Sequence, residues 1–225
     1  EMSSSTVAGS LGMNYDAGSQ IATYFPIIDT SLVNGVKLEI SPGHEAYAFN
    51  VHLRHFFYGP YQLAGIPYFG GTLYDPNNPA HIPLVVQDQI DSRGAEIAAV
   101  LTEMQTALSS GLPVFLTGDF NEASHLDWTQ AADTAGVHSA VVPWPTSIEV
   151  QNAGLSDSYR VVHPDEVINP GNTWSPVFGP DSASVFASFE DLSDSVVAAS
   201  GCLSFGSSCV SAAACWENIV SSSFT

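Results

Sequence analysis

A helical pattern that runs directly into a short buried strand constrains the fold of this chain most strongly. Within residues 91–110, apolar side chains recur at the spacing of one helix face: Ile97, Leu101, Met104 and Leu108. Gly111 then provides a typical helix stop, and the apolar run at 112–116 has the length of a buried strand. This succession is compatible with a mixed α/β domain, and it predicts that the next residues leave the carboxyl end of a strand.

Those next residues, Thr-Gly-Asp-Phe-Asn at 117–121, place a carboxylate and a carboxamide two residues apart. Asp119 is suited to activate a water molecule or to bind a hard divalent cation, and Asn121 can donate to a phosphoryl oxygen without adding charge. The alternative is that the segment is only a turn, because Gly, Asp and Asn all favour turns and caps. The motif alone does not decide between the two.

A second polar pair ends another expected strand, in Asn50-Val51-His52-Leu53. Strand alternation puts Asn50 and His52 on the same face, which we expect to be shared with the site. A histidine there can protonate a leaving oxygen or bind a phosphate oxygen, since its pKa lies near neutrality. The alternative is a hydrogen-bonded histidine with a structural role.

The remaining elements follow from turn residues and short apolar runs. We expect a loop on the substrate side at 56–83, where Tyr, Gly, Pro and Asn occur without periodicity. A capping box at Ser124–Asp127 predicts a helix that runs through Ala132. Further expected elements are a helix at 3–11 that ends at Gly12, strands at 21–25, 35–40 and 46–53, a short helix or turn at 155–160 with Ser156 as its cap, and a strand start at 172–175.

Charge is the main compositional constraint on function. Four basic residues against 23 acidic ones give a net charge of −19, which repels polyanions at long range. A phosphate-bearing substrate would therefore need a metal or a local arginine. Adaptation to a salty or extracellular medium is the simpler explanation of this charge, and it favours a secreted or extracytoplasmic location while leaving the compartment open.

Two regions of different composition divide the chain, a domain at 1–180 and a Ser/Ala/Cys-rich tail at 181–225 without Lys, Arg or His. The three cysteines all lie in this tail, and their spacings match no metal-ligand pair. No run of about 18 apolar residues is present, so no membrane span is expected. The chain opens on Glu1 without an initiator Met, which suggests a fragment or a processed product.

Four motifs in order resemble the endonuclease/exonuclease/phosphatase superfamily: residues 50–53, Gly-Asp-Phe-Asn at 118–121, Leu-Ser-Asp-Ser-Tyr-Arg at 155–160, and Thr-Trp at 173–174. The resemblance covers roughly residues 1–180. It implies a four-layer αββα sandwich of two packed mixed sheets, here incomplete at its edges. It also implies hydrolysis of a phosphoester with Mg²⁺ or Mn²⁺.

The resemblance implies roles for individual residues. Asp119 would orient or deprotonate the attacking water, and Asn121 would contact the phosphate near the metal. His52 would contact the scissile phosphate or assist the leaving group. Glu1 would join Asp119 and Asn121 as a metal ligand. Residues that would bind the substrate are Asn50, His125 and Arg160, although Arg160 and Asp157 are also expected to form a structural salt bridge or cap.

The chain also departs from the family, because it lacks the Asp-His dipeptide that completes the family's catalytic pair. An alternative is therefore a catalytically incomplete relative that is inactive or only binds phosphate or metal. A Ser or Cys hydrolase is disfavoured, because no Gly-x-Ser-x-Gly element or suitably placed Cys is present. Because no basic stripe is visible, we expect a small phosphodiester or lipid headgroup as substrate more than long DNA.

Overall fold

A computed structural model describes residues 4–171 and 199–200 of the chain. It confirms the expected class, because strands in two sheets combine with helices in a mixed α/β fold. Within these residues no helix is long and apolar enough to cross a membrane. The strand expected to start at 172 and most of the serine-rich tail lie outside the described residues.

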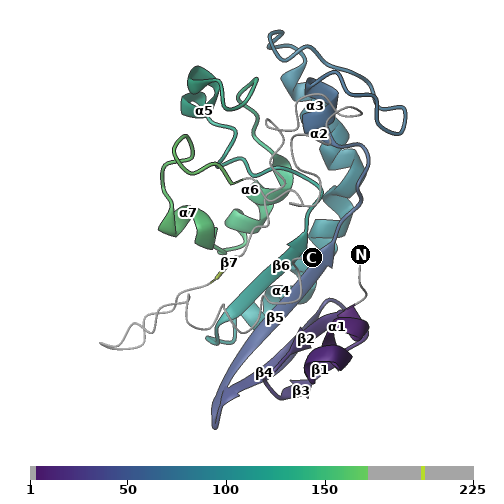
Figure 1. Ribbon diagram of the computed structural model, residues 1–225, viewed down its shortest axis with the longest axis vertical. Coiled ribbons are helices and arrows are strands. Elements are labelled where there is room, and N and C mark those ends of the chain that lie inside the picture. The colour runs from purple at the N-terminus through teal and green to yellow at the C-terminus, as the bar shows by residue number, and fades with distance from the viewer. Residues whose placement is uncertain (1–3, 172–198, 201–225) are drawn as a thin grey trace.

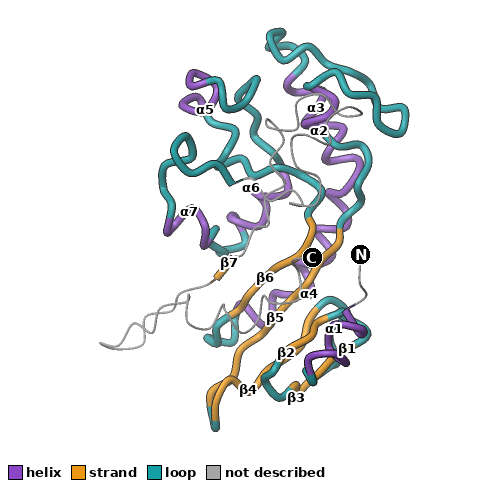
Figure 2. The backbone as a smooth tube through the Cα atoms, in the orientation of Figure 1, coloured by secondary structure: helices purple, strands orange, loops and turns teal. Residues whose placement is uncertain are grey.

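The N-terminal segment is a helix followed by a two-stranded sheet (Figures 1 and 2). Helix α1 (Ser4–Leu11) ends where Gly12 takes a φ of 65°, as the glycine stop predicted. It packs through Ala8 on Met13 and Ala22. The small sheet pairs β1 (Asn14–Asp16) with β2 (Ile21–Thr23) in antiparallel fashion.

The main sheet has the order β3-β4-β5-β6-β7, and its polarity is mixed. Strands β3 (Ile27–Asp29), β4 (Gly35–Ser41) and β5 (His44–His52) are antiparallel neighbours. Strand β6 (Val114–Asp119) runs parallel to β5 and pairs on its other edge with the antiparallel β7 (Ala199–Ser200). One parallel pair inside the sheet thus brings two carboxyl strand ends together, as the arrows of Figure 1 show.

A long helical stretch connects β5 to β6 and covers one sheet face (Figure 1). It consists of α3 (Ile82–Gln89), the π-helical segment η1 (Ile90–Gly94) and α4 (Ala95–Leu108). The prediction that the helix starts at residue 91 was wrong by about two and a half turns, since the helical stretch begins at Ile82. The expected loop at 56–83 also contains the short helix α2 (Gly59–Leu63).

The core beneath α4 explains the predicted helix face. Ile97, Leu101 and Met104 are buried against β5, β6 and α6 (Pro145–Asn152). The opposite face of β4 and β5 packs against β2 of the small sheet. Because β5 alternates, Phe49, Val51 and Leu53 face α4, while Asn50 and His52 point to the other face.

The helix predicted from the capping box begins later than expected. Residues 124–128 form turns, and α5 (Gln130–Ala135) starts after Thr129, whose hydroxyl accepts the Ala132 N–H. The reason is that Asp127 and Trp128 are buried and make tertiary contacts instead. The last helix, α7 (Ser158–Val162), is capped by Asp157 and not by Ser156.

Candidate active site

The parallel pairing of β5 and β6 sets His52 directly beside Asp119. Nε2 of His52 lies 3.7 Å from Oδ2 of Asp119, and the side chains are 66% and 52% exposed. Both residues therefore present polar atoms to solvent at the carboxyl ends of adjacent parallel strands. This edge is where open α/β sheets commonly place ligands.

Gly118 makes this close approach of the two strands possible. Its φ is 133°, and a Cβ atom built there would lie 1.9 Å from the carbonyl oxygen of Val51. Beyond the strands, the Leu53 N–H donates to the carbonyl oxygen of Asp119 over 2.9 Å. The glycine that precedes Asp119 is thus required by packing.

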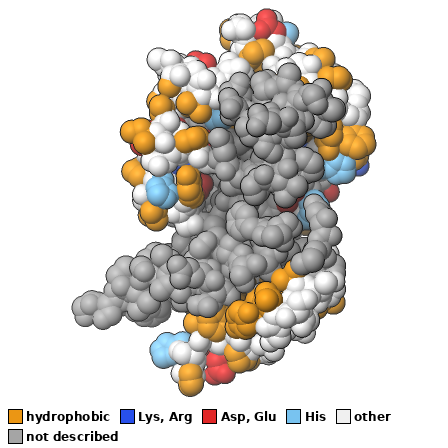
Figure 3. All heavy atoms as spheres, in the orientation of Figure 1, with side chains coloured by type: hydrophobic (Ala, Val, Ile, Leu, Met, Phe, Trp, Pro, Cys, Tyr) orange, Lys and Arg blue, Asp and Glu red, His pale blue; other side chains and the backbone are white. Residues whose placement is uncertain are grey.

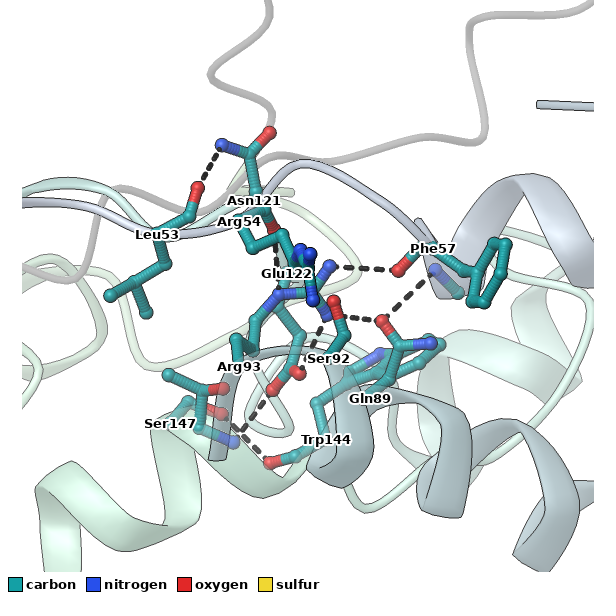
Figure 4. A network of polar contacts seen from close by, with 12 residues as sticks. Leu53, Arg54, Phe57, Gln89, Ser92, Arg93, Asn121, Glu122, Trp144 and Ser147 are labelled. Atoms are coloured by element: carbon teal, nitrogen blue, oxygen red, sulfur yellow. Dashed lines mark hydrogen bonds and ion pairs between the residues drawn. The ribbon is translucent and has the colours of Figure 1, made fainter. Parts of the chain in front are cut away.

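Asn121 is tied to both strand ends and adopts a left-handed backbone, with φ at 49°. Its N–H donates to Oδ1 of Asp119 over 2.8 Å, and its Nδ2 donates to the carbonyl oxygen of Leu53 over 2.9 Å. Figure 4 shows the amide oxygen of Asn121 pointing away from Leu53. The segment is therefore a turn, as one reading predicted, and this turn also orients Asp119 and Asn121.

Asn50 lies on the same strand face as His52 but has a structural contact. Its register partner on β6 is Thr117, two residues before Asp119. Its Nδ2 donates to the carbonyl oxygen of Ser19 over 3.1 Å, which links the small sheet to the main one. The small sheet therefore borders the face that carries His52.

His125 is held against α6. Its Nδ1 lies 2.8 Å from the Ser147 hydroxyl, and its Nε2 lies 3.0 Å from Oε1 of Gln151. Burial lowers the pKa of His125. These contacts are with helix α6, and none of the described contacts of His125 is with His52 or Asp119.

Arg160 is buried in an ion pair with Asp127, with 2.8 Å between Nε and Oδ1. Its two terminal nitrogens donate to the carbonyl oxygens of His163 and Asn169. Burial raises the pKa of Asp127 to about 6, although the charge of Arg160 opposes the shift. Arg160 therefore holds the segment after α7 in place, and the structure does not bring it to the His52–Asp119 edge.

The expected metal ligand Glu1 lies outside the described residues.

A buried ion pair behind the site escaped the sequence analysis. Nη1 of Arg93 lies 3.3 Å from Oε2 of Glu122, and neither side chain is exposed. Arg93 also donates to the carbonyl oxygens of Arg54 and Phe57 (Figure 4). Glu122 lies in the loop after β6, and the two carbonyl oxygens lie in the loop after β5. Arg93, which contacts both, therefore joins the two loops.

One sequence signal could have revealed this pair. Arg93 lies four residues before Ile97 and eight before Leu101, so it continues the apolar face of the helix. A charge on such a face needs a buried partner. Glu122, next to the Gly-Asp-Phe-Asn motif, is that partner.

The oxygen atoms at this edge suit a hard cation. Asp119 and Asn121 offer a carboxylate and a carboxamide, and Mg²⁺ commonly takes one or two carboxylates together with water and substrate phosphate. Residues 4–171 and 199–200 contain no group of three or more His, Cys, Asp or Glu side chains that could hold a metal ion.

Comparison with known proteins shows a similarity to a nematode protein. No family model matches the chain. An uncharacterized protein of Caenorhabditis elegans is 30% identical over 161 residues, which cover 68% of this chain and 47% of that protein. The chain thus spans about half the length of the curated relative it matches.

Proposed function

We propose that this chain is a Mg²⁺- or Mn²⁺-dependent phosphoester hydrolase of the endonuclease/exonuclease/phosphatase type, with its sheets packed as a four-layer sandwich. One observation carries the proposal: His52 and Asp119 meet, both exposed, at the carboxyl ends of adjacent parallel strands. The resemblance of the motifs around them supports the same activity. The face on which His52 lies is also the one that the small sheet borders.

Asp119 would orient and deprotonate the attacking water. The Asn121 N–H holds Oδ1, so Oδ2 is left as the oxygen that faces solvent and His52. Asp119 and Asn121 would hold the cation, together with Glu1 by resemblance. When bound, the cation would stabilise the charge that develops on the phosphoryl oxygens.

His52 would act on the leaving oxygen. Its Nε2 lies 3.7 Å from Oδ2 of Asp119, which is long for a hydrogen bond, so this nitrogen is open to a substrate oxygen. A protonated imidazole at this edge can donate to a departing alkoxide. The alternation of β5 keeps His52 out of the core and on the substrate side.

Hydrolysis of bis-p-nitrophenyl phosphate with Mg²⁺ or Mn²⁺ tests the proposal. We expect Asp119→Ala to lower kcat by at least about 100-fold, as loss of a positioned acid–base group does. The matched control is Asp91→Ala, which removes an exposed carboxylate whose described partner is the Gln87 amide. Both variants should keep the wild-type circular dichroism spectrum.

Two results would contradict the proposal. Turnover that persists in Asp119→Ala would place the chemistry elsewhere. Absence of turnover in the folded wild-type chain with either metal would favour the alternative, a relative that is inactive or only binds phosphate or metal.

A further inference from the structure

Arg54 is the only basic residue of the described chain without an ion-pair partner. The other three are engaged: Lys37 with Glu45, Arg93 with Glu122, and Arg160 with Asp127. Arg54 is exposed and follows His52 by two residues. Among the residues that the structure describes, the one guanidinium without an ion-pair partner therefore lies two residues from His52, in a chain with a net charge of −19.

The backbone of Arg54 is fixed on both sides. Its N–H donates to Oε2 of Glu96 over 2.8 Å, and its carbonyl oxygen accepts from Nε of Arg93 over 3.0 Å. The preceding residue, Leu53, accepts from Nδ2 of Asn121. Arg54 is thus held at a constant position relative to Asp119 and Asn121.

An aromatic surface, formed by His55, Phe56, Tyr68 and Phe69, adjoins Arg54. The guanidinium carbon lies 4.5 Å from the centre of the Phe56 ring. The ring centres of the four residues lie 4.6–6.2 Å apart in contacting pairs. Phe69 is 65% exposed. At the right-hand edge of Figure 3, hydrophobic and histidine side chains gather beside a basic one.

Buried tyrosines support this surface from below. Tyr68 contacts Tyr61 with ring centres 5.3 Å apart, and Tyr61 in turn contacts Tyr58 at 4.7 Å. Tyr58 and Tyr61 are both buried. The exposed rings therefore rest on a packed base, which lowers the entropy cost of stacking a ligand on them.

We propose that Arg54 and the aromatic surface form a substrate subsite for a small phosphodiester that carries an aromatic ring. This rests on the proposed function. Arg54 would bind a non-bridging phosphate oxygen, and the ring of the substrate would stack on Phe69. Flat π-systems stack on exposed aromatic side chains and on guanidinium planes. A long polyanion would meet 23 acidic residues, so a single diester is favoured.

Binding of two phosphodiesters of equal charge tests the subsite, and turnover is prevented by withholding the divalent cation. Diphenyl phosphate and diethyl phosphate are titrated calorimetrically into the full chain in the presence of EDTA. We expect diphenyl phosphate to bind at least about tenfold more tightly, as stacking of one ring would give. Phe69→Ala should remove this preference and leave diethyl phosphate binding unchanged, whereas Arg54→Gln should weaken both.

Matched controls are Tyr24→Ala, which removes an exposed aromatic ring outside the surface, and Lys37→Gln, which removes a positive charge paired with Glu45. Neither should change binding. Equal binding of the two anions, no binding of diphenyl phosphate, or an unchanged preference in Phe69→Ala would overturn the subsite.

The two proposals fail separately. Diphenyl phosphate binding that depends on Phe69, together with no hydrolysis of bis-p-nitrophenyl phosphate by the wild type with Mg²⁺ or Mn²⁺, would leave the subsite standing and refute the phosphoesterase. Hydrolysis that depends on Asp119, together with a Phe69→Ala variant that keeps the preference for diphenyl phosphate, would support the phosphoesterase and refute the subsite.

Discussion

At the scale of single residues, Glu122 makes stability depend on pH. Burial raises its pKa from 4.5 to about 7, while the charge of Arg93 opposes the shift. Glu122 then binds more protons in the folded state than in the unfolded one between about pH 4.5 and 7, so its contribution to stability is greatest below pH 4.5 and falls as pH rises to 7. We expect this fall to reach at most about 3 kcal/mol.

Urea denaturation of the wild type and Glu122→Gln at several pH values measures this effect. The variant should show a flatter dependence between pH 4.5 and 7, even if its absolute stability is lower because Arg93 loses its charged partner. Asp127, whose pKa is also raised, is common to both proteins and cancels in the comparison. Parallel pH profiles would refute this role of Glu122.

The candidate site was partly predictable because short motifs specify backbone geometry. Strand alternation and the Gly-Asp-Phe-Asn turn placed His52 and Asp119 on strand ends, and the structure pairs them. The partner of Arg160 was not predictable, because Asp127 lies 33 residues away and its nearer carboxylate, Asp157, caps the helix instead. Tertiary pairing of charges leaves no local pattern in a sequence.

At the scale of elements, the contact between β5 and β6 depends on Gly118. Gly118→Ala would force a Cβ atom to 1.9 Å from the Val51 carbonyl oxygen at a φ of 133°. We expect a loss of more than about 3 kcal/mol from steric overlap and backbone strain together. Thermal and urea unfolding would measure it.

The matched control is Gly9→Ala in α1, where a Cβ atom would meet nothing within 4 Å. That change should raise stability by about 0.5–1 kcal/mol, because alanine is the better helix former. If the Gly118→Ala variant has the same unfolding midpoint as the wild type, the two strands do not approach as closely at Gly118 as described.

Element boundaries were harder to predict than element types. The helix before β6 was expected from residue 91, but it begins at Ile82 and passes through η1 before α4. The buried face continues through η1 and the end of α3, but there it carries the polar side chains of Gln89 and Arg93, so a search for an apolar stripe finds only α4. The capping box at Ser124 failed because burial of Trp128 outweighs local helix propensity.

At the scale of the whole molecule, the placement of charge predicts how substrate size alters the effect of salt. Arg54 is the only unpaired cation in the described part of the chain, and the net charge is −19. A monoanionic diester meets mainly the local site, whereas an oligonucleotide also meets the repulsive field of the whole protein. Salt screens this field over roughly 10 Å at 0.1 M.

We therefore expect kcat/KM for a single-stranded oligonucleotide to rise between about 0.05 and 0.5 M salt, and kcat/KM for methyl p-nitrophenyl phosphate to change little. This sign is opposite to that of proteins that bind nucleic acid through many cations and release counterions. Rates for both substrates are measured at constant Mg²⁺, with Lys37→Gln and Arg54→Gln as charge variants. A rate for the oligonucleotide that falls with salt would mean that cations beyond Arg54 contact it, and a long nucleic acid would then replace the small diester as the favoured substrate.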